Sequence, residues 1–443
     1  MKDYEVAELI SPQDKKTELS PRVALEQRWA RSLEKLLPIP GRNPFWRYSR
    51  IRSSPDAYFG WKIHVSATIL EACSVLEVIG PALAHRNILF KAPSTLSRLM
   101  TLNSGIIFGY SQIGKFITIF PGSKSEFLGL LNVLEPGLER WSDSPPVPFD
   151  IRLGTSCIYY RYGSFVHETS TIPAIGDGSS MIEDTRDHRM FEYSIANDPL
   201  NRHDRKISRR SEISFPARYL VRSALSQRGK GGVYSAIDIG SSPPRQCVIK
   251  EGRLNGETTW RGLDGRRRVQ NEAKVLSLLS DRLPVPKIFD SFERSGNYYL
   301  VLEQIDGTRL DRIKLEQVTI RDRLDLARQL CAIVDTVHRC GWLWRDCKPQ
   351  NVFVDSNGLL RPIDFEGACP IDSPDPEAWS TLTFSNDLLT STKYKESPVS
   401  LDLYQLRLCL SWLLLETDRS TDETYDLRPE RQEGGIRDAS GDF

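Results

Sequence analysis

Two neighbouring stretches decide the fold of the second half of the chain, Trp344-Arg-Asp-Cys-Lys-Pro-Gln-Asn351-Val-Phe-Val and Pro362-Ile-Asp-Phe-Glu366. Asp346 and Asn351 stand five positions apart, and Asp364 follows eighteen positions after Asp346. Carboxylate and amide oxygens are ligands that Mg²⁺ accepts in proteins. The stretches therefore indicate a loop that joins a reactive carboxylate to a place for a metal ion.

Both offsets are those of the catalytic and metal-binding loops of protein kinases. In these roles Asp346 orients the attacking hydroxyl group and takes its proton. Asn351 and Asp364 hold Mg²⁺ on the phosphates, and Lys348 neutralises charge on the transferring group. A chance polar loop is the alternative, and further motifs in the right order disfavour it.

Upstream, Arg228-Gly-Lys-Gly-Gly-Val-Tyr234 lies between strand-like flanks, where glycines let a backbone close over phosphates. Its nucleotide-binding candidates are Gly229, Gly231 and Gly232. The strand Cys247-Val-Ile-Lys250 ends in a lysine, and Glu272 lies in a predicted helix over 269–279. Such a pair can clamp the phosphates of ATP or GTP. Taken alone, the glycine-rich stretch could be an ordinary hairpin turn. Lys250 and Glu272, taken alone, could be two unrelated surface charges.

The chain also departs from the kinase pattern. Trp344 replaces the usual histidine, Glu366 replaces the usual glycine, and no Ala-Pro-Glu follows. Asp402, before an apolar helix, has the position of the structural aspartate of the large lobe. We therefore expect a shortened large lobe without an obvious activation segment, which argues against a phospho-regulated signalling kinase.

The first half has an α+β pattern. Residues 60–67 alternate between apolar and polar side chains, 115–120 and 157–162 read as further strands, and helical periodicity lies between them. Periodicity fades over 184–218, which indicates a linker. The predicted organisation is a charged, partly helical lead-in (1–40), an α+β domain (41–205), a two-lobed domain (206–417) and a polar tail (418–443).

Composition excludes several classes of protein. The 59 basic and 58 acidic residues nearly cancel, which argues against a nucleic-acid partner. The N-terminus lacks the apolar segment of a secretory signal, and the longest apolar run is too short to span a membrane. The eight cysteines form no Cys-x-x-Cys pair, so we expect reduced thiols in a cytoplasmic protein.

Three segments carry a resemblance to a known family: Gly60-Trp-Lys-Ile-His-Val-Ser66, Gly114-Lys-Phe-Ile-Thr-Ile-Phe-Pro121 and Tyr160-Arg-Tyr-Gly-Ser-Phe165. They resemble the N-terminal part of class III and IV lanthipeptide synthetases, in which the Asp-Phe-Glu variant is also common. The resemblance implies a phosphothreonine-lyase-like domain before the kinase-like domain. Together these would phosphorylate Ser/Thr of a ribosomal precursor peptide and eliminate the phosphate, giving dehydroalanine or dehydrobutyrine. No room for the family's cyclase domain follows residue 417, so a separate cyclase is a further expected partner.

The resemblance also implies roles for individual residues. Lys115 would be the base and His64 the acid. The expected ligands of the phosphate or the enolate are Lys62, Arg152 and Arg161. Lys62 and His64 project to the same face of a strand, as a shared site requires. Without the resemblance, ordinary residues of a half-exposed sheet would explain them.

One departure concerns the segment between Arg98 and Lys115, where basic residues are expected but Gly105 and Tyr110 stand. Three alternatives follow: the phosphate site is weaker, Arg52 or Lys91 rebuilds it, or the lyase is inactive. Three hypotheses follow: a two-step peptide dehydratase, a Ser/Thr kinase whose N-terminal domain only binds substrate, and a non-catalytic scaffold. The intact kinase motifs disfavour the third.

Overall fold

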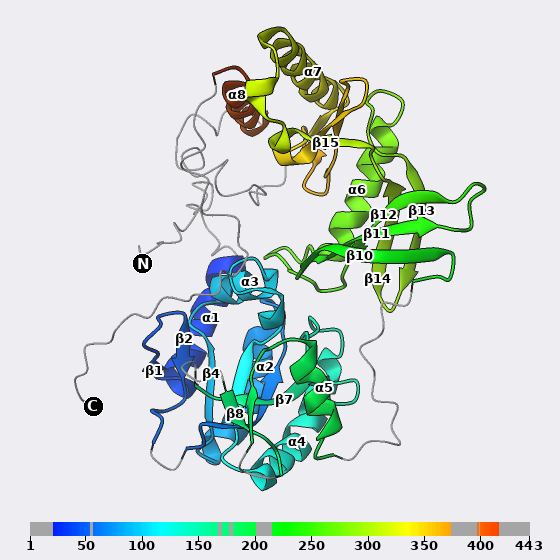
Figure 1. The fold of residues 1–443 in the computed structure, drawn as a ribbon. Helices are drawn as coiled ribbons and strands as arrows, with labels where there is room; N and C mark the ends of the chain where they lie inside the picture. The colour runs from blue at the N-terminus through cyan, green and yellow to red at the C-terminus, as the bar shows by residue number, and fades with distance from the viewer. Residues whose placement is uncertain are drawn as a thin grey trace.

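The computed structural model describes residues 21–53, 56–166, 171–176, 180–200, 215–373, 397 and 399–415. They form an α+β domain followed by a two-lobed domain, as the sequence predicts (Figure 1). The expected polar tail lies outside the described residues, and so does most of the region in which an activation segment was sought.

An antiparallel sheet forms the centre of the N-terminal domain, with strand order β1-β2-β4-β5-β3-β7-β6. Its strands are β1 (Ile39–Pro40), β2 (Trp46–Tyr48), β3 (Phe59–Val65), β4 (Leu89–Pro93), β5 (Ile117–Phe120), β6 (Ile151–Arg152) and β7 (Ile158–Ser164). The alternation in 60–67 is confirmed as β3, with Ile63 and Val65 in the core. Because side chains alternate along a strand, Lys62 and His64 lie on the opposite face.

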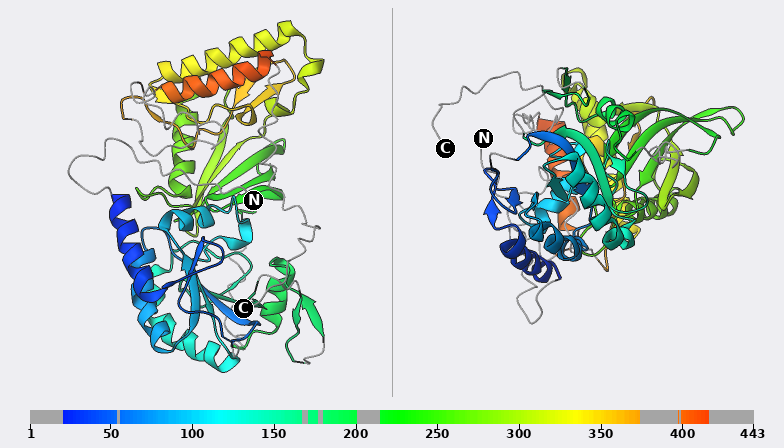
Figure 2. Two further views of the ribbon diagram at one scale, coloured as in Figure 1. Left: turned by 90° about the vertical axis from the view of Figure 1, so that its left-hand side faces the viewer. Right: turned by 90° about the horizontal axis from the view of Figure 1, so that it is seen from below.

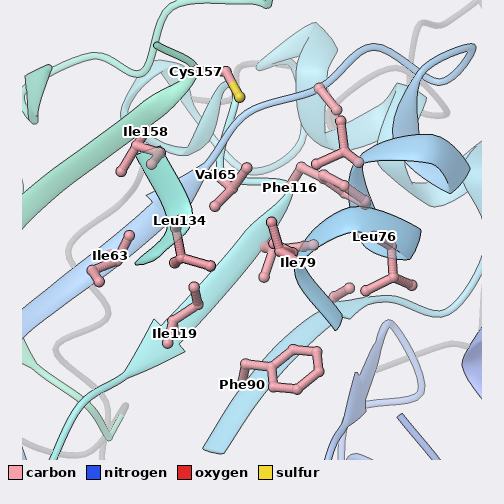
Figure 3. Close-up of a cluster of buried hydrophobic side chains, with 14 of the residues drawn as sticks. Ile63, Val65, Leu76, Ile79, Phe90, Phe116, Ile119, Leu134, Cys157 and Ile158 are labelled. Atoms are coloured by element: carbon pink, nitrogen blue, oxygen red, sulfur yellow. The ribbon is translucent and has the colours of Figure 1, made fainter. Parts of the chain in front are cut away.

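The apolar face of this sheet packs on helices. The helices of the domain are α1 (Pro21–Leu36), α2 (Ala72–His85), α3 (Leu96–Ser104), α4 (Lys124–Leu138) and α5 (His188–Ala196), with short η2 (Tyr110–Gln112) and η3 (Glu139–Trp141) and a hairpin of β8 (Thr171–Pro173) and β9 (Met181–Glu183). Ile79 and Leu134 pack against Ile63 and Ile119 (Figure 3). Each such side chain stabilises the fold by about 1.5–3 kcal/mol on burial, which fixes the sheet that carries the polar face.

Two helices lie in segments that the sequence showed only as a lead-in and a linker. The lead-in contains α1, whose Trp29 and Leu33 are buried in the core of the domain. The predicted linker contains α5, which Asp187 caps by accepting the Arg189 N–H and whose Met190 packs on the same core. Both helices are short or charged, so tertiary packing, not local periodicity, makes them part of the domain.

The small lobe of the second domain is a sheet in the order β10-β11-β12-β14-β13, packed on one helix. Its elements are β10 (Tyr219–Arg228), β11 (Gly231–Asp238), β12 (Arg245–Gly252), α6 (Gly265–Leu279), β13 (Ile288–Arg294) and β14 (Asn297–Glu303). Helix α6 begins four residues before the predicted start because the Asp264 side chain caps it, accepting the Arg267 N–H at 2.9 Å.

The large lobe is helical on one side. Helices α7 (Ile320–Arg339) and α8 (Ser400–Leu415) lie side by side (Figure 2). Small sheets carry its loops: β15 (Gly307–Arg309), β16 (Trp342–Leu343), β17 (Val352–Asp355), β18 (Leu360–Pro362) and β19 (Cys369–Pro370), with η4 (Leu310–Arg312), η5 (Leu315–Gln317) and η6 (Pro349–Asn351). Across the described ranges, none of the helices is both long and apolar enough to cross a membrane.

Candidate functional site

The predicted lysine–glutamate clamp is present in the two-lobed domain. Lys250 Nζ, at the inner part of β12, lies 2.7 and 2.8 Å from the two carboxylate oxygens of Glu272 on α6. The same Nζ lies 3.0 Å from Asp364 Oδ1. Residues from strand, helix and loop thus converge at one point, which is the arrangement that holds the phosphates of ATP in a kinase.

The charges at this point stabilise one another. Burial alone would lower the pKa of Lys250, but the Asp364 and Glu272 carboxylates raise it above its ordinary value. Burial alone would raise the pKa of Asp364, but Lys250, Lys230 and Lys348 hold it below its usual range. Lys250 is therefore a cation and Asp364 an anion at neutral pH, as phosphate and metal binding require.

The catalytic loop brings Asp346, Lys348 and Asn351 together. Asn351 Nδ2 donates to Asp346 Oδ2 at 2.7 Å and to the Asp346 carbonyl at 3.0 Å. Lys348 Nζ lies 2.9 Å from Asp346 Oδ2. Because the Asn351 amide nitrogen is committed to Asp346, its oxygen is the atom left to bind a metal.

Asp364 and Asn351 supply hard oxygen donors that suit Mg²⁺. The described residues contain no group of three or more His, Cys, Asp or Glu side chains that could hold a metal. Mg²⁺ is usually bound by one or two protein carboxylates together with substrate phosphates. The donor set therefore fits a metal ion that arrives with the nucleotide.

Asp402 anchors this loop, as predicted. Its carboxylate accepts the N–H groups of Trp344 at 2.7 Å and Arg345 at 2.6 Å, and His338 Nε2 lies 2.8 Å away. Arg345 has φ 67°, a conformation that costs energy and needs such support. Trp344 stacks on Phe365, with ring centroids 5.1 Å apart. The tryptophan thus packs on the residue that follows Asp364, the predicted metal ligand.

The glycine-rich loop joins β10 to β11. A Cβ atom at Gly231 would lie 1.7 Å from the Glu251 carbonyl oxygen, so only glycine fits there. Lys230 forms an ion pair with Glu366, which links the glycine-rich loop to the loop that carries Asp364. In the sequence Glu366 counted only as a departure from glycine, whereas in the structure it is a partner of the phosphate-binding loop.

Lys250→Ala and Glu272→Ala should each raise the KM for ATP, and the double variant should be little worse than either one. The two side chains act as a unit, so their losses should not add. Steady-state kinetics of phosphate incorporation would measure this. Glu293→Ala, at an exposed ion pair with Arg266, is the matched control and should leave KM unchanged. Multiplicative losses would show that Lys250 and Glu272 work independently.

A second polar cluster lies on the face of the N-terminal sheet opposite the apolar core, where Lys62, His64 and Arg161 are buried. Lys62 pairs in register with Arg161, and His64 with Thr118, which in turn pairs with Lys91. Directly opposed residues share a face of the sheet. Lys62, His64, Lys91 and Arg161 therefore lie on the same face, in two adjacent rows.

Asp150 ties two of the predicted catalytic residues together. His64 Nδ1 donates to Asp150 Oδ2, and Lys115 Nζ lies 3.4 Å from Asp150 Oδ1. All three side chains are buried. Sequence reasoning missed Asp150, although a lone carboxylate in the apolar stretch over 147–153 is a signal that could have found it.

Arg161 is the least satisfied cation of this cluster. Nη2 forms an ion pair with Asp184, but Nε and Nη1 are buried and have no hydrogen-bond partner among the described residues. Lys62 donates to the Ser164 carbonyl oxygen at 2.7 Å. A buried guanidinium with unused donors is costly unless an anion completes it, so this point suits an acidic ligand.

Arg152 does not join the cluster, contrary to the prediction that it binds phosphate. Its guanidinium donates to the backbone carbonyl oxygens of Ser142, Thr155 and Ser156. These carbonyl oxygens lie in loops, where they need a hydrogen-bond donor from a side chain. Arg152 therefore has a structural role, and its place among the cations is taken by Arg186, which lies in the stretch predicted as a linker.

The pKa values of the cluster follow from burial and crowding of cations. Burial, together with the nearby cations Arg186 and Lys115, lowers the pKa of Lys91 to about 7. Burial lowers the pKa of Lys115 to about 8, although Asp150 opposes the shift. Burial and Arg161 lower the pKa of Lys62 well below its ordinary value. Lysines in such surroundings can lose a proton near neutral pH.

Comparison with known proteins identifies both parts. Residues 40–195 match the family described as RamC, N-terminal domain, and residues 220–418 match the protein kinase domain. The chain carries a RamC N-terminal domain followed by a protein kinase domain. The predicted resemblance to lanthipeptide synthetases is thereby confirmed at the level of its domains.

Among curated relatives, the RamC-type chain is 28% identical to a probable SapB synthase of Streptomyces coelicolor over 335 residues, which are 71% of this chain and 36% of that protein. The kinase domain is 31% identical to serine/threonine-protein kinase F of Synechocystis, over 35% of this chain and 34% of that protein. It is 27% identical to serine/threonine-protein kinase PrkC of Bacillus subtilis, over 40% of this chain and 26% of that protein. The chain thus spans about a quarter to a third of the length of these relatives.

A protein kinase domain in general uses ATP and Mg²⁺.

Proposed function

We propose that this protein is a two-step peptide dehydratase. The kinase domain would transfer phosphate from ATP to Ser/Thr of a ribosomal precursor peptide, and the RamC-type domain would eliminate it to leave dehydroalanine or dehydrobutyrine. The observation that carries the second step is a cluster of basic side chains: the buried Lys62, Lys115 and Arg161 and the partly buried Lys91 and Arg186 outnumber the carboxylates of Asp150 and Asp184. A phosphate ester dianion supplies the missing negative charge.

The kinase step needs positioning more than covalent chemistry. Asp346 would accept the proton of the substrate hydroxyl, and Lys348 would balance charge on the transferred group. Lys250 and the glycine-rich loop would hold the nucleotide. Mg²⁺ bound to Asp364 and Asn351 would neutralise the phosphates. The peptide product is a phosphate ester, which has a far better leaving group than hydroxide.

Elimination needs a base for the Cα proton and an acid for the leaving oxygen. His64 is the proposed acid. Burial lowers its pKa to about 3 against the pull of Asp150, and the charge of a bound phosphate dianion would raise that value. Arg161, with its unused donors, would bind the phosphate oxygens. Asp150 would orient the imidazole ring from the Nδ1 side.

Two lysines compete for the role of base. Lys115 is the residue that the family resemblance implies, but its Asp150 partner favours the protonated form. Lys91 is surrounded by cations and lies in the same cross-strand row as His64. A base must be neutral before it acts, so these surroundings favour Lys91 as the base and assign Lys115 to the phosphate.

The pH dependence of elimination separates the two lysines. The rate should rise with pH as the base loses its proton, because the neutral amine is the active form. The midpoint should lie near the pKa of about 7 for Lys91, or about 8 for Lys115. The measurement is the rate of phosphate release from a synthetic phosphoserine peptide over the range from about pH 5.5 to about pH 9.5, which brackets both pKa values. A falling limb at higher pH would report the loss of the His64 proton, whereas a profile with no rising limb in this range would contradict a lysine base.

The direct test of the function is co-expression with a small Ser/Thr-rich precursor and mass spectrometry of the product. Loss of water supports the dehydratase. Gain of phosphate alone supports the second hypothesis, a Ser/Thr kinase with a substrate-binding N-terminal domain. Two observations favour that second hypothesis: Arg152 is occupied by backbone carbonyls, and no basic residue lies between Arg98 and Lys115.

A further inference from the structure

The glycine-rich loop of the kinase domain rests on the RamC-type domain. The Gly229 N–H donates to the Ser104 carbonyl oxygen at 2.9 Å, at the C-terminal end of α3. A Cβ atom at Gly229 would lie 1.7 Å from the Asn103 carbonyl oxygen. Helix α3 lies at the end of its domain that faces the small lobe (Figure 1). The loop therefore contacts backbone that cannot move aside as a side chain would.

Arg253 strengthens this contact from the kinase side. Its N–H donates to the Lys230 carbonyl oxygen at 2.8 Å, and its guanidinium donates to the Arg228 carbonyl oxygen at 2.8 Å. The same guanidinium lies over the Tyr110 ring of the RamC-type domain, 5.6 Å from its centroid. The two residues that flank Gly229 are thus held by a side chain that also contacts the other domain.

Asn103 connects this contact with the proposed elimination site. Its buried amide donates through Nδ2 to the Ala67 carbonyl oxygen at 3.0 Å, and Oδ1 accepts the Gly114 N–H at 3.2 Å. Ala67 follows the strand that carries His64, and Gly114 directly precedes Lys115. A single side chain therefore fixes the two segments that present these residues.

We propose that Asn103 is a positioning residue shared by the two sites, and that the loop contact at the end of α3 couples nucleotide binding to phosphate elimination. The glycine-rich loop closes over nucleotide phosphates in kinases. Because the Gly229 N–H is hydrogen-bonded to the C-terminal end of α3, closure of the loop would shift that end. Conversely, the position of that end would favour or oppose closure. Coupling of this kind is reciprocal and typically changes affinity by about 5- to 150-fold. The proposal rests on the proposed function only for its elimination half.

The decisive variant is Gly229→Ala, because its methyl group cannot fit against the Asn103 carbonyl. Elimination from a pre-phosphorylated synthetic phosphoserine peptide requires no nucleotide, so a change confined to ATP binding would not affect it. We expect this rate to fall about tenfold, within the usual range of coupling. Gly296→Ala in the β13–β14 turn is the control: it strains a backbone with φ 80°, but its methyl group would meet only the Leu254 side chain, so it should eliminate like wild type. Equal elimination rates for Gly229→Ala and wild type would overturn the coupling.

The reverse measurement does not depend on lyase activity. Asn103→Ala should weaken binding of ATP with Mg²⁺ about fivefold or more by calorimetry, although the residue lies in the other domain. Val75→Ala, a buried truncation in α2 of the same domain, controls for lost stability and should bind ATP like wild type. Unchanged ATP affinity in Asn103→Ala would overturn the proposal. If wild-type protein eliminates no phosphate, the proposed function fails, while this measurement still decides the coupling.

Discussion

Replacing Asp364 or Asp346 with alanine should abolish phosphorylation of the peptide. The Asp364 variant would lack a ligand of the metal ion. The Asp346 variant would lack the carboxylate that orients the attacking hydroxyl group. Positioning and charge stabilisation supply nearly all of the catalysis of phosphoryl transfer, so each loss should cost at least about 10²-fold in rate. Incorporation of labelled phosphate into a Ser/Thr-rich peptide measures it.

The control for a general effect of removing acidic charge is Asp372→Ala, an exposed residue shortly after the metal-binding loop. It should phosphorylate the peptide at the wild-type rate. Binding of ATP without Mg²⁺ should persist in Asp364→Ala, because Lys250 still pairs with Glu272. An Asp364→Ala protein that incorporates phosphate at the wild-type rate would refute the assignment of the kinase site.

Replacing His64, Lys91 or Lys115 with alanine should uncouple the two steps. The kinase site lies in the other domain and should still act, so the peptide should accumulate phosphoserine or phosphothreonine. Each site would then gain about 80 Da instead of losing about 18 Da as water, as the proposed acid–base elimination requires. Mass spectrometry of the peptide distinguishes the two products.

The three variants should also differ from one another. Loss of the base removes the proton-abstraction step, so Lys91→Ala should eliminate more slowly than Lys115→Ala if Lys91 is the base. The matched controls are His85→Ala and Lys124→Ala, at exposed positions of the same domain. If the wild-type protein yields only phosphopeptide, the dehydratase proposal fails. The function would then be that of a Ser/Thr kinase whose N-terminal domain binds the substrate.

Much of the kinase site could be predicted from sequence because its residues lie in short motifs. Asp346, Lys348 and Asn351 occupy one loop, so their spacing along the chain already fixes their neighbourhood. Lys250 and Glu272 were found from the order of the motifs, and the structure brings them within hydrogen-bonding distance. The role of Glu366 was not found, because its partner Lys230 is distant in sequence.

The elimination site was predicted less completely because strands and loops far apart in sequence assemble it. Lys62 and His64 were placed on one face by the alternation of a single strand. Arg161, Lys91 and Asp150 join them only through strand pairing and loop packing. In the sequence, Arg152 is as good a candidate for phosphate binding as Arg161, because both carry a guanidinium. Only the structure shows that the Arg152 guanidinium donates its hydrogen bonds to backbone carbonyls.

The sequence by itself determined the two-domain order, the α+β character of the first half and the nucleotide clamp of the second. Periodicity and motif spacing are local properties, and they need no knowledge of what packs against them. Only the tertiary structure decided that α1 and α5 pack on the core of the first domain, that Asp150 joins His64 to Lys115, and that Gly229 rests on α3. These features depend on contacts between segments distant along the chain, which burial of the two cores brings together.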